Sequence, residues 1–98
     1  MAKAYVIGQV TVNSPEGYVN YSQHVQGTLD KYGGKYLVRG GNSTQVEGTE
    51  QGNRKVVIEF ASREAAETWY NSPEYQAIVP HRKANSVGHV AIVDGFEG

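Results

Sequence analysis

The segment from Arg54 to Gln76 constrains the fold most, because three element signals follow one another in it without a linker. Residues 54–60 alternate between two sets of side chains, which is typical of a strand. Ser62 and Ser72 each stand where a helix can begin, and the second is followed by proline and glutamate, which favour a first helical turn. We therefore expect a strand, a helix over 63–70 and a second helix from residue 73.

The chain before this segment supplies another strand and a long helix. Residues 4–12 alternate and are rich in β-branched side chains, as a strand is. Ser14 is the expected N-cap and Pro15 the first helical residue. The helix should end at Gly33 or Gly34, either of which can form a left-handed C-cap. Its buried stripe is formed by residues at helical spacing, namely Tyr18, Tyr21, Val25, Leu29 and Tyr32.

A second strand is expected over residues 35–39, and residues 43–47 can extend it beyond a bulge or bend at two glycines. A polar turn then leads back into the strand 54–60, so that the two strands form an antiparallel hairpin. Alternation places the side chains of the second strand on two faces, with Tyr36 and Val38 on one and Leu37 and Arg39 on the other.

The end of the chain completes a β-α-β-β-α-β order. Pro80 should kink or end the helix that begins at residue 73, because a proline inside a helix costs ~3 kcal/mol. Residues 87–93 read as the last strand. This order predicts an α+β fold of the ferredoxin-like type, one antiparallel sheet with the helices on one face, in a single domain of 98 residues.

The face of the sheet away from the helices predicts a partner. The more aliphatic side chains of the strands should lie under the helices. The other face then carries a mixed set that is too apolar to stay in water as one patch: Tyr5, Ile7, Gln9, Val57 and Glu59. A homodimer that packs sheet against sheet is the simplest way to cover it.

Composition excludes several classes of function. The chain has no cysteine, so disulfides and thiolate zinc sites are excluded, and a cytoplasmic location is expected. Net charge is −1 with scattered Lys and Arg, whereas binding to nucleic acid needs a basic face. The strand 54–60 also lacks the stacking aromatic residues of an RNA recognition motif. No apolar run approaches the ~20 residues of a membrane span, and the first residues do not form a signal peptide.

Three stretches resemble one bacterial family. They are Lys31-Tyr32-Gly33-Gly34-Lys35-Tyr36-Leu37-Val38-Arg39-Gly40-Gly41, Val57-Ile58-Glu59-Phe60, and Trp69-Tyr70-Asn71-Ser72-Pro73-Glu74-Tyr75-Gln76. Together they closely resemble the family called domain of unknown function 1330. The resemblance implies a dimeric α+β barrel, a superfamily that includes cofactor-independent monooxygenases, isomerases and lyases. The chain departs from the family at Ile78-Val79-Pro80-His81, where alanines are usual.

Arg39 and Glu59 are the first candidates for a site. Both lie on strands and are expected on the less aliphatic face or its rim. Arg39 could hold a carboxylate or enolate in a fork of hydrogen bonds, and Glu59 could act as a general base if burial raised its pKa. The alternative is that they form a structural ion pair, with each other or across the dimer.

Four further residues could serve a site on the helices. His24 could transfer a proton, or could be a half-exposed packing residue. Trp69 and Tyr75 could line an aromatic pocket, or belong to the core. Arg82 could add positive charge to the rim of that pocket, or only favour the end of its helix. No spacing of His, Asp and Glu matches a metal site, and no cofactor is expected.

These residues lead to two functional interpretations. The first is a homodimer that binds a small aromatic or keto acid and catalyses a cofactor-free proton transfer or oxygenation. In it Arg39 holds the anionic group, and Glu59 or His24 moves the proton. The second is a non-catalytic structural or regulatory dimer whose polar residues serve only the fold.

Overall fold

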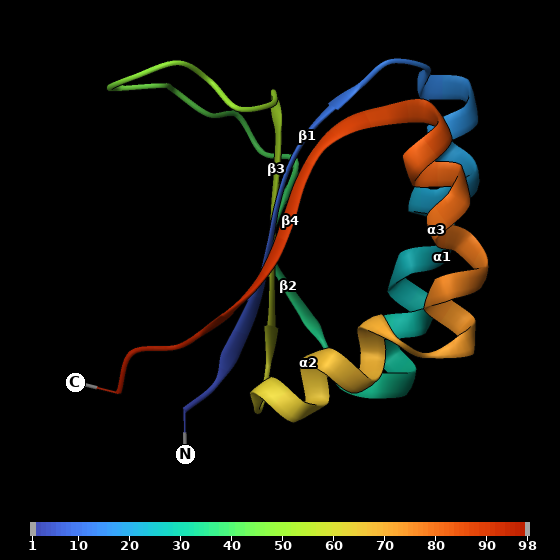
Figure 1. Cartoon of the computed structure of the whole chain (residues 1–98), viewed down its shortest axis with the longest axis vertical. Coiled ribbons are helices and arrows are strands. Elements are labelled where there is room, and N and C mark those ends of the chain that lie inside the picture. Colours follow the sequence, from blue (N-terminus) through green and yellow to red (C-terminus); the bar gives the residue numbers. More distant parts are fainter. Residues whose placement is uncertain (1, 98) are drawn as a thin grey trace.

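The computed structural model describes residues 2–97 and contains the expected succession of strands and helices (Figure 1). The helical part after the third strand is divided into two helices that meet at Asn71 and Ser72. In chain order the elements are β1 (Ala4–Val12), α1 (Pro15–Tyr32), β2 (Lys35–Arg39), β3 (Arg54–Phe60), α2 (Arg63–Tyr70), α3 (Pro73–Asn85) and β4 (Ser86–Asp94).

The four strands form one antiparallel sheet in the order β2-β3-β1-β4. All three helices cover the same face of that sheet, while α1 and α3 lie side by side (Figure 1). This arrangement confirms the ferredoxin-like fold predicted from the order of elements.

The register separates the two faces as predicted. Val6 pairs with Ile58, and both side chains lie under the helices at 3% exposure. The neighbouring pair, Tyr5 and Glu59, points to the other face. The core is formed by the inner face and the helix stripes: Ala4, Val6, Tyr18, Tyr21, Val25, Leu29, Ile58, Phe60, Ala66, Trp69, Tyr75 and Val79.

The helix ends follow the capping signals with one exception. Ser62 and Ser72 each accept a hydrogen bond at 3.1 Å, from the backbone N–H of Ala65 and of Tyr75. Gly33 ends α1 in the left-handed conformation, with φ 82°. Ser14 occupies the N-cap position of α1, but its side chain makes no capping bond.

Helix α3 continues through Pro80 to Asn85, so the expectation of an early end is wrong. The proline removes one backbone donor, but contacts beyond it hold the last turn. Arg82 is buried, and its backbone carbonyl accepts a hydrogen bond from the Ser86 hydroxyl at 2.6 Å. The carbonyl of Asn85 accepts from the backbone N–H of Asn13 at 2.8 Å, which ties the helix to the start of α1.

The hairpin between β2 and β3 differs from the prediction in two ways. An irregularity between Tyr36 and Val38 inserts one extra residue, and Arg39 therefore pairs with Val56 on the helix-side face. Alternation alone had placed Arg39 on the opposite face. Residues 43–47 belong to a loop and do not extend the strand. Val46 in that loop is 87% exposed.

Neither helix nor strand among residues 2–97 covers the second face of the sheet (Figure 1). The loop between β2 and β3 and the C-terminal tail both project towards that side. We call it the open face. Within the same residues, no helix is long and apolar enough to cross a membrane.

Candidate functional site

A pocket opens between the inner face of the sheet and helices α1 and α3. Its cavity volume is only ≈ 30 Å³. The pocket is therefore a narrow slot. Its walls combine small apolar strand residues with aromatic and basic side chains: Val6, Gly8, Val10, Tyr18, Tyr21, Ser22, Tyr36, Arg54, Val56, Ile58, Trp69, Tyr75, Arg82 and Val90.

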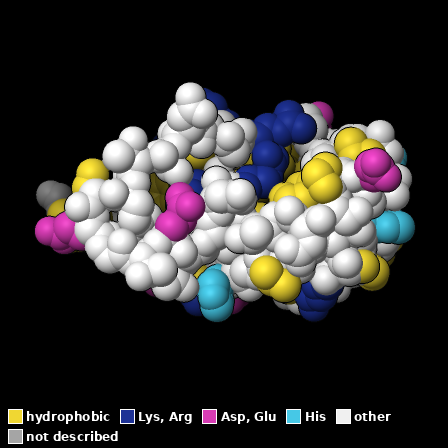
Figure 2. All heavy atoms as spheres, turned by 90° about the horizontal axis from the view of Figure 1, so that it is seen from above, with side chains coloured by type: hydrophobic (Ala, Val, Ile, Leu, Met, Phe, Trp, Pro, Cys, Tyr) yellow, Lys and Arg dark blue, Asp and Glu magenta, His cyan; other side chains and the backbone are white. Residues whose placement is uncertain are grey.

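Two arginines bring positive charge into this pocket. Arg54 comes from the first position of β3, and Arg82 comes from the last turns of α3. The Nε atoms of both are buried and have no hydrogen-bond partner among the described residues. Figure 2 shows Lys and Arg side chains gathered in the hollow between the sheet and the helices. A buried donor without an acceptor is unfavourable, so these two atoms mark a place where an anion could bind.

Each arginine stands over a tyrosine ring. The guanidinium carbon of Arg54 lies 5.6 Å from the centre of the Tyr18 ring, and that of Arg82 lies 5.9 Å from the centre of the Tyr21 ring. The two rings are themselves 5.4 Å apart. These cation–π contacts stabilise the positions of the guanidinium groups but do not neutralise their charge.

Two tyrosine hydroxyls form a buried pair in the same pocket. The hydroxyl oxygens of Tyr21 and Tyr75 are 2.7 Å apart. Burial, followed by the neighbouring Tyr75, raises the pKa of Tyr21. Burial also raises the pKa of Tyr75, although its hydrogen bonds to Tyr21 and Arg82 and the charge of Arg82 oppose that effect. Both hydroxyls therefore stay protonated at neutral pH, and within the pair one hydroxyl donates to the other.

Trp69 and Tyr75 belong to the core and also line the pocket. Each is 1% exposed, and their rings are 4.0 Å apart. The indole N–H of Trp69 donates to the Thr28 hydroxyl at 2.9 Å, and that hydroxyl donates to the Val25 carbonyl at 2.7 Å. This chain of bonds fixes the inner wall.

Arg39 lies at the edge of the pocket. Its side chain is exposed, and its guanidinium carbon lies 5.3 Å from the centre of the Tyr36 ring, which lines the pocket. Burial raises the pKa of Tyr36, whereas the charges of Arg39 and Arg54 lower it. Gly40 follows with φ 65°, and a Cβ there would run into the Arg54 guanidinium.

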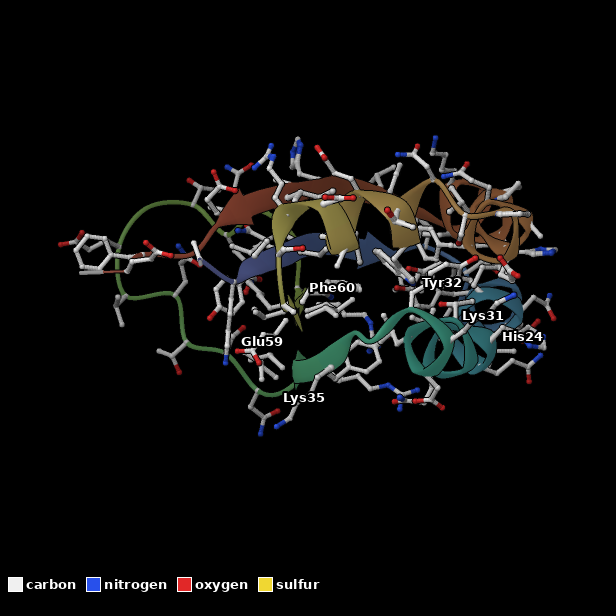
Figure 3. The ribbon with its side chains drawn as sticks, turned by 90° about the horizontal axis from the view of Figure 1, so that it is seen from below. His24, Lys31, Tyr32, Lys35, Glu59 and Phe60 are labelled. Carbon is white, nitrogen blue, oxygen red and sulfur yellow. The ribbon has the colours of Figure 1, made fainter. Side chains whose placement is uncertain are left out.

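Glu59 and His24 are not brought together with Arg39. Glu59 lies on the open face, where it accepts a hydrogen bond from the Tyr5 hydroxyl at 3.3 Å and pairs with Lys3 at 3.5 Å. His24 lies on the exposed side of α1, with its ring 3.4 Å from the Gln23 amide. Figure 3 shows the two side chains on opposite sides of the molecule. Neither residue lines the pocket.

No group of three or more metal-ligating side chains was found among residues 2–97. No Asp, Glu or His lines the pocket either. The charge of Arg54 and Arg82 therefore has no counterion among the described residues of this site.

Glu74 joins two of the stretches that resemble the family. Its carboxylate accepts hydrogen bonds from the Tyr32 hydroxyl at 2.7 Å and from the Lys31 ammonium. The hydrogen bond from Lys31, and then that from Tyr32, hold the pKa of Glu74 at about 2, below its usual value of 4.5. The contact fastens the end of α1 to the start of α3, and none of its three residues lines the pocket.

Sequence reasoning missed Arg54, although a signal for it was present. Arg54 shares its alternation with Val56, Ile58 and Phe60, so it belongs to the inner face of β3. Arg82 was expected at the rim of the pocket or as a favourable charge at the end of its helix, and Pro80 was expected to kink or end that helix. Its spacing of seven residues from Tyr75 places both on one face of a continuous helix.

Several solved structures share the fold. A protein of unknown function from Rhodopseudomonas palustris is 17% identical, with a TM-score of 0.76 over 99% of this chain and 85% of its own. A NIPSNAP domain protein from Burkholderia xenovorans is 23% identical, with a TM-score of 0.58 over 100% and 95%. SnoaB, a cofactor-independent oxygenase from Streptomyces nogalater, is 10% identical, with a TM-score of 0.58 over 100% and 97%.

A search of curated proteins found no match. The family comparison did find one, over almost the whole chain. The match covers residues 3–96, including the loop between β2 and β3 and all the pocket-lining residues. The chain therefore belongs to the family described as Domain of unknown function (DUF1330), which here has a ferredoxin-like fold.

Proposed function

We propose that this protein binds a small aromatic or keto acid in the pocket between the sheet and helices α1 and α3. One observation carries the proposal: Arg54 and Arg82 present buried, unbonded Nε atoms to a pocket with aromatic walls and no acidic side chain. A carboxylate accepts paired hydrogen bonds from a guanidinium, and tyrosine rings suit a flat organic body. Because the slot is narrow, a ligand must be thin or must displace a tyrosine ring.

The predicted ligand-binding residues take distinct roles in this proposal. Arg82 holds the anionic group, together with Arg54, which the sequence reasoning did not include. Trp69 and Tyr75 form the wall against which the ligand lies. Arg39, over the Tyr36 ring at the edge, attracts the anion towards the mouth.

The chemistry that we propose for this site is a cofactor-free proton transfer or oxygenation. The shared fold with a cofactor-independent oxygenase supports it only as an analogy of scaffold. Two arginines and the Tyr21–Tyr75 donors could stabilise an enolate formed from a bound acid. Glu59 and His24 stay predicted proton carriers although neither lines the pocket, and unchanged substrate turnover in both Glu59→Gln and His24→Gln would exclude them.

A non-catalytic regulatory dimer is the second candidate. The observation that favours it is the lack of any Asp, Glu or His among the described residues that line the pocket. Such a site has no ordinary general base. In this case the protein would bind the acid and release it unchanged.

The homodimer remains part of both candidates. Val93 and Leu37 on the outer strands are 42% and 47% exposed, and the whole open face lacks a cover within residues 2–97. A second copy packed on that face would bury these side chains. Light scattering should give twice the chain mass of 10.7 kDa. A monomer at micromolar concentration would rule out the dimer.

A thermal-shift screen of aromatic and keto acids tests binding. Ligands that raise the melting temperature should lose most of that effect in Arg82→Ala and part of it in Arg39→Ala. Arg63→Ala is the matched control, because Arg63 pairs with Asp94 and Glu67 on the surface of α2, outside the pocket. Shifts that persist undiminished in Arg82→Ala would refute the proposed site.

Turnover separates the two candidates. Each ligand found by the screen is incubated with protein, while oxygen uptake and the exchange of its acidic C–H for deuterium are followed. Uptake or exchange that Arg82→Ala abolishes supports catalysis. An unchanged ligand with neither signal supports the regulatory dimer.

A further inference from the structure

The pocket contains two positive charges that come from separate elements. Arg54 lies on the sheet and Arg82 on α3, so the two guanidinium groups reach the slot from different walls. Arg82 is 9% exposed, and the Nε atom of each arginine is buried without a partner. No acidic side chain within residues 2–97 lines the pocket. The side chains that line the pocket therefore carry a net charge of two positive units.

Charge balance bears on the kind of acid that fits. A buried charge without a counterion is strongly unfavourable, and two like charges in one pocket also repel each other. A monocarboxylate would compensate one guanidinium and leave the other. A ligand with two anionic groups would compensate both, and each group could accept from a guanidinium fork.

Both arginines line the same pocket, and each contacts one of two neighbouring tyrosine rings. The guanidinium carbons stand 5.6 Å and 5.9 Å from two tyrosine ring centres that are 5.4 Å apart. The stacked positions hold the two forks over neighbouring rings, of Tyr18 and Tyr21. Between them the pocket is lined by valines and aromatic rings, which suit an organic body better than a hydrated inorganic ion.

We propose that the natural ligand of this pocket is a small dianionic organic acid, such as a dicarboxylate, whose two anionic groups are held separately by Arg54 and Arg82. This inference rests on the proposed binding function and narrows its ligand class. The Tyr21–Tyr75 hydroxyl pair, adjoining Arg82, donates to the anionic group on that side. Arg39 remains outside the slot and is not one of the two anchors.

Matched aromatic acids test the dianion preference. Calorimetry compares benzoate with phthalate, isophthalate and terephthalate, which add a second carboxylate at three different separations on the same ring. We expect at least one dicarboxylate to bind about tenfold more tightly than benzoate, a difference of about 1.4 kcal/mol. Butyrate and succinate form a second, aliphatic pair, and inorganic phosphate is the probe for an anion without an organic body.

The outcomes separate this inference from the proposed function. Benzoate that binds as tightly as every dicarboxylate overturns the dianion preference and leaves the binding function standing. If neither the mono- nor the dicarboxylates bind, both are overturned. Phosphate that binds more tightly than every dicarboxylate also overturns the organic dianion as the ligand.

Variants test whether the two named arginines carry the preference. Arg54→Gln and Arg82→Gln should each reduce the ratio of dicarboxylate to monocarboxylate affinity to about one, because a single cation remains. Arg54→Lys and Arg82→Lys keep the charge and should keep part of the ratio, which guards against a loss caused by misfolding. Arg63→Gln on the surface is the control and should leave the ratio unchanged.

Salt provides an independent readout. The ratio should persist between about 0.15 M and 0.5 M salt, because charges in a pocket are screened less than exposed ones. The affinity ratio of dicarboxylate to monocarboxylate could instead disappear at the higher salt, or persist in both glutamine variants. Either result would show that the second carboxylate contacts the protein surface. It would overturn the assignment to Arg54 and Arg82.

Discussion

The two faces of the sheet differ in charge balance: charges are paired on the open face and unpaired on the inner face. On the open face, Glu59 is partnered by Lys3 and by the Tyr5 hydroxyl, so positive and negative groups compensate each other. On the inner face, Arg54 and Arg82 enter a buried pocket that has no acidic side chain. Folding alone does not require the second arrangement, since apolar residues would fill that space more favourably. The difference supports the proposal that the inner charges serve binding, whereas the charges on the open face compensate each other.

The largest expected effect compares neighbouring residues of β1 that point to opposite faces. Val6→Lys would bury an unpaired charge under the helices and should destabilise the fold by about 3–5 kcal/mol, a large part of the stability of so small a domain. Ile7→Lys places the same charge on the open face and should leave a folded monomer. Circular dichroism and light scattering measure the two results. Ile7→Lys that remains dimeric would show that the open face is not the interface.

The next comparison removes one hydrogen bond from each face. Trp69→Phe leaves the buried Thr28 hydroxyl without its donor and should reduce the free energy of unfolding by about 1–3 kcal/mol. Tyr5→Phe removes the longer, part-buried hydrogen bond to Glu59 and should change the free energy of unfolding by less than about 0.5 kcal/mol. Urea denaturation of both variants measures which of them loses more free energy of unfolding. Equal losses would contradict the contrast between a packed and an uncovered face.

A smaller effect, of opposite sign, is expected when an inner arginine is neutralised. Arg82→Met removes a buried charge without a counterion and should stabilise the ligand-free protein by about 1 kcal/mol, while it weakens binding of an acid. Lys3→Met on the open face should have little effect, because its ion pair is largely exposed. Thermal melts with and without ligand measure both. A destabilised, still-binding Arg82→Met would mean that Arg82 serves the fold.

The smallest effect concerns the contact of Glu74 with Lys31 and Tyr32, which lies outside both faces. Folding lowers the pKa of Glu74 to about 2, so its carboxylate favours the folded state at neutral pH. That contribution is complete above the usual value of 4.5 and is lost as pH falls towards about 2. Acid unfolding of Glu74→Gln should show a weaker pH dependence in this window than the parent. Glu64→Gln on α2 is the control, and equal curves for all three proteins would rule out the contribution.

Local patterns were sufficient for the elements and for the faces of most strands. Alternation in β1 and β3 placed Val6, Ile58 and Phe60 in the core, because one buried face fixes the register of a strand. Capping signals located the starts of α2 and α3 at Ser62 and Ser72, because serine side chains bond to the first backbone N–H groups.

The candidate site was less predictable, because its geometry depends on contacts between distant residues. The irregularity in β2 moved Arg39 to the helix side, and it arises from pairing with β3. Helix α3 continues beyond Pro80 because the carbonyls of Asn85 and Arg82 accept hydrogen bonds from Asn13 and Ser86. The helix propensities of single residues do not include such contacts. Trp69, Tyr75 and Arg82 were named in advance and line one pocket, whereas Glu59 and His24 lie elsewhere.

The sequence by itself determined the order of elements, the ferredoxin-like fold and the family of this protein, because these depend on periodicity, caps and motifs that are local in the chain. Only the tertiary structure decided that Arg54 and Arg82 meet in a pocket and that Glu59 faces away from it. Arg54 and Arg82 lie 28 positions apart in the chain. Whether two such charges share a pocket depends on strand register and helix packing, which no local pattern specifies.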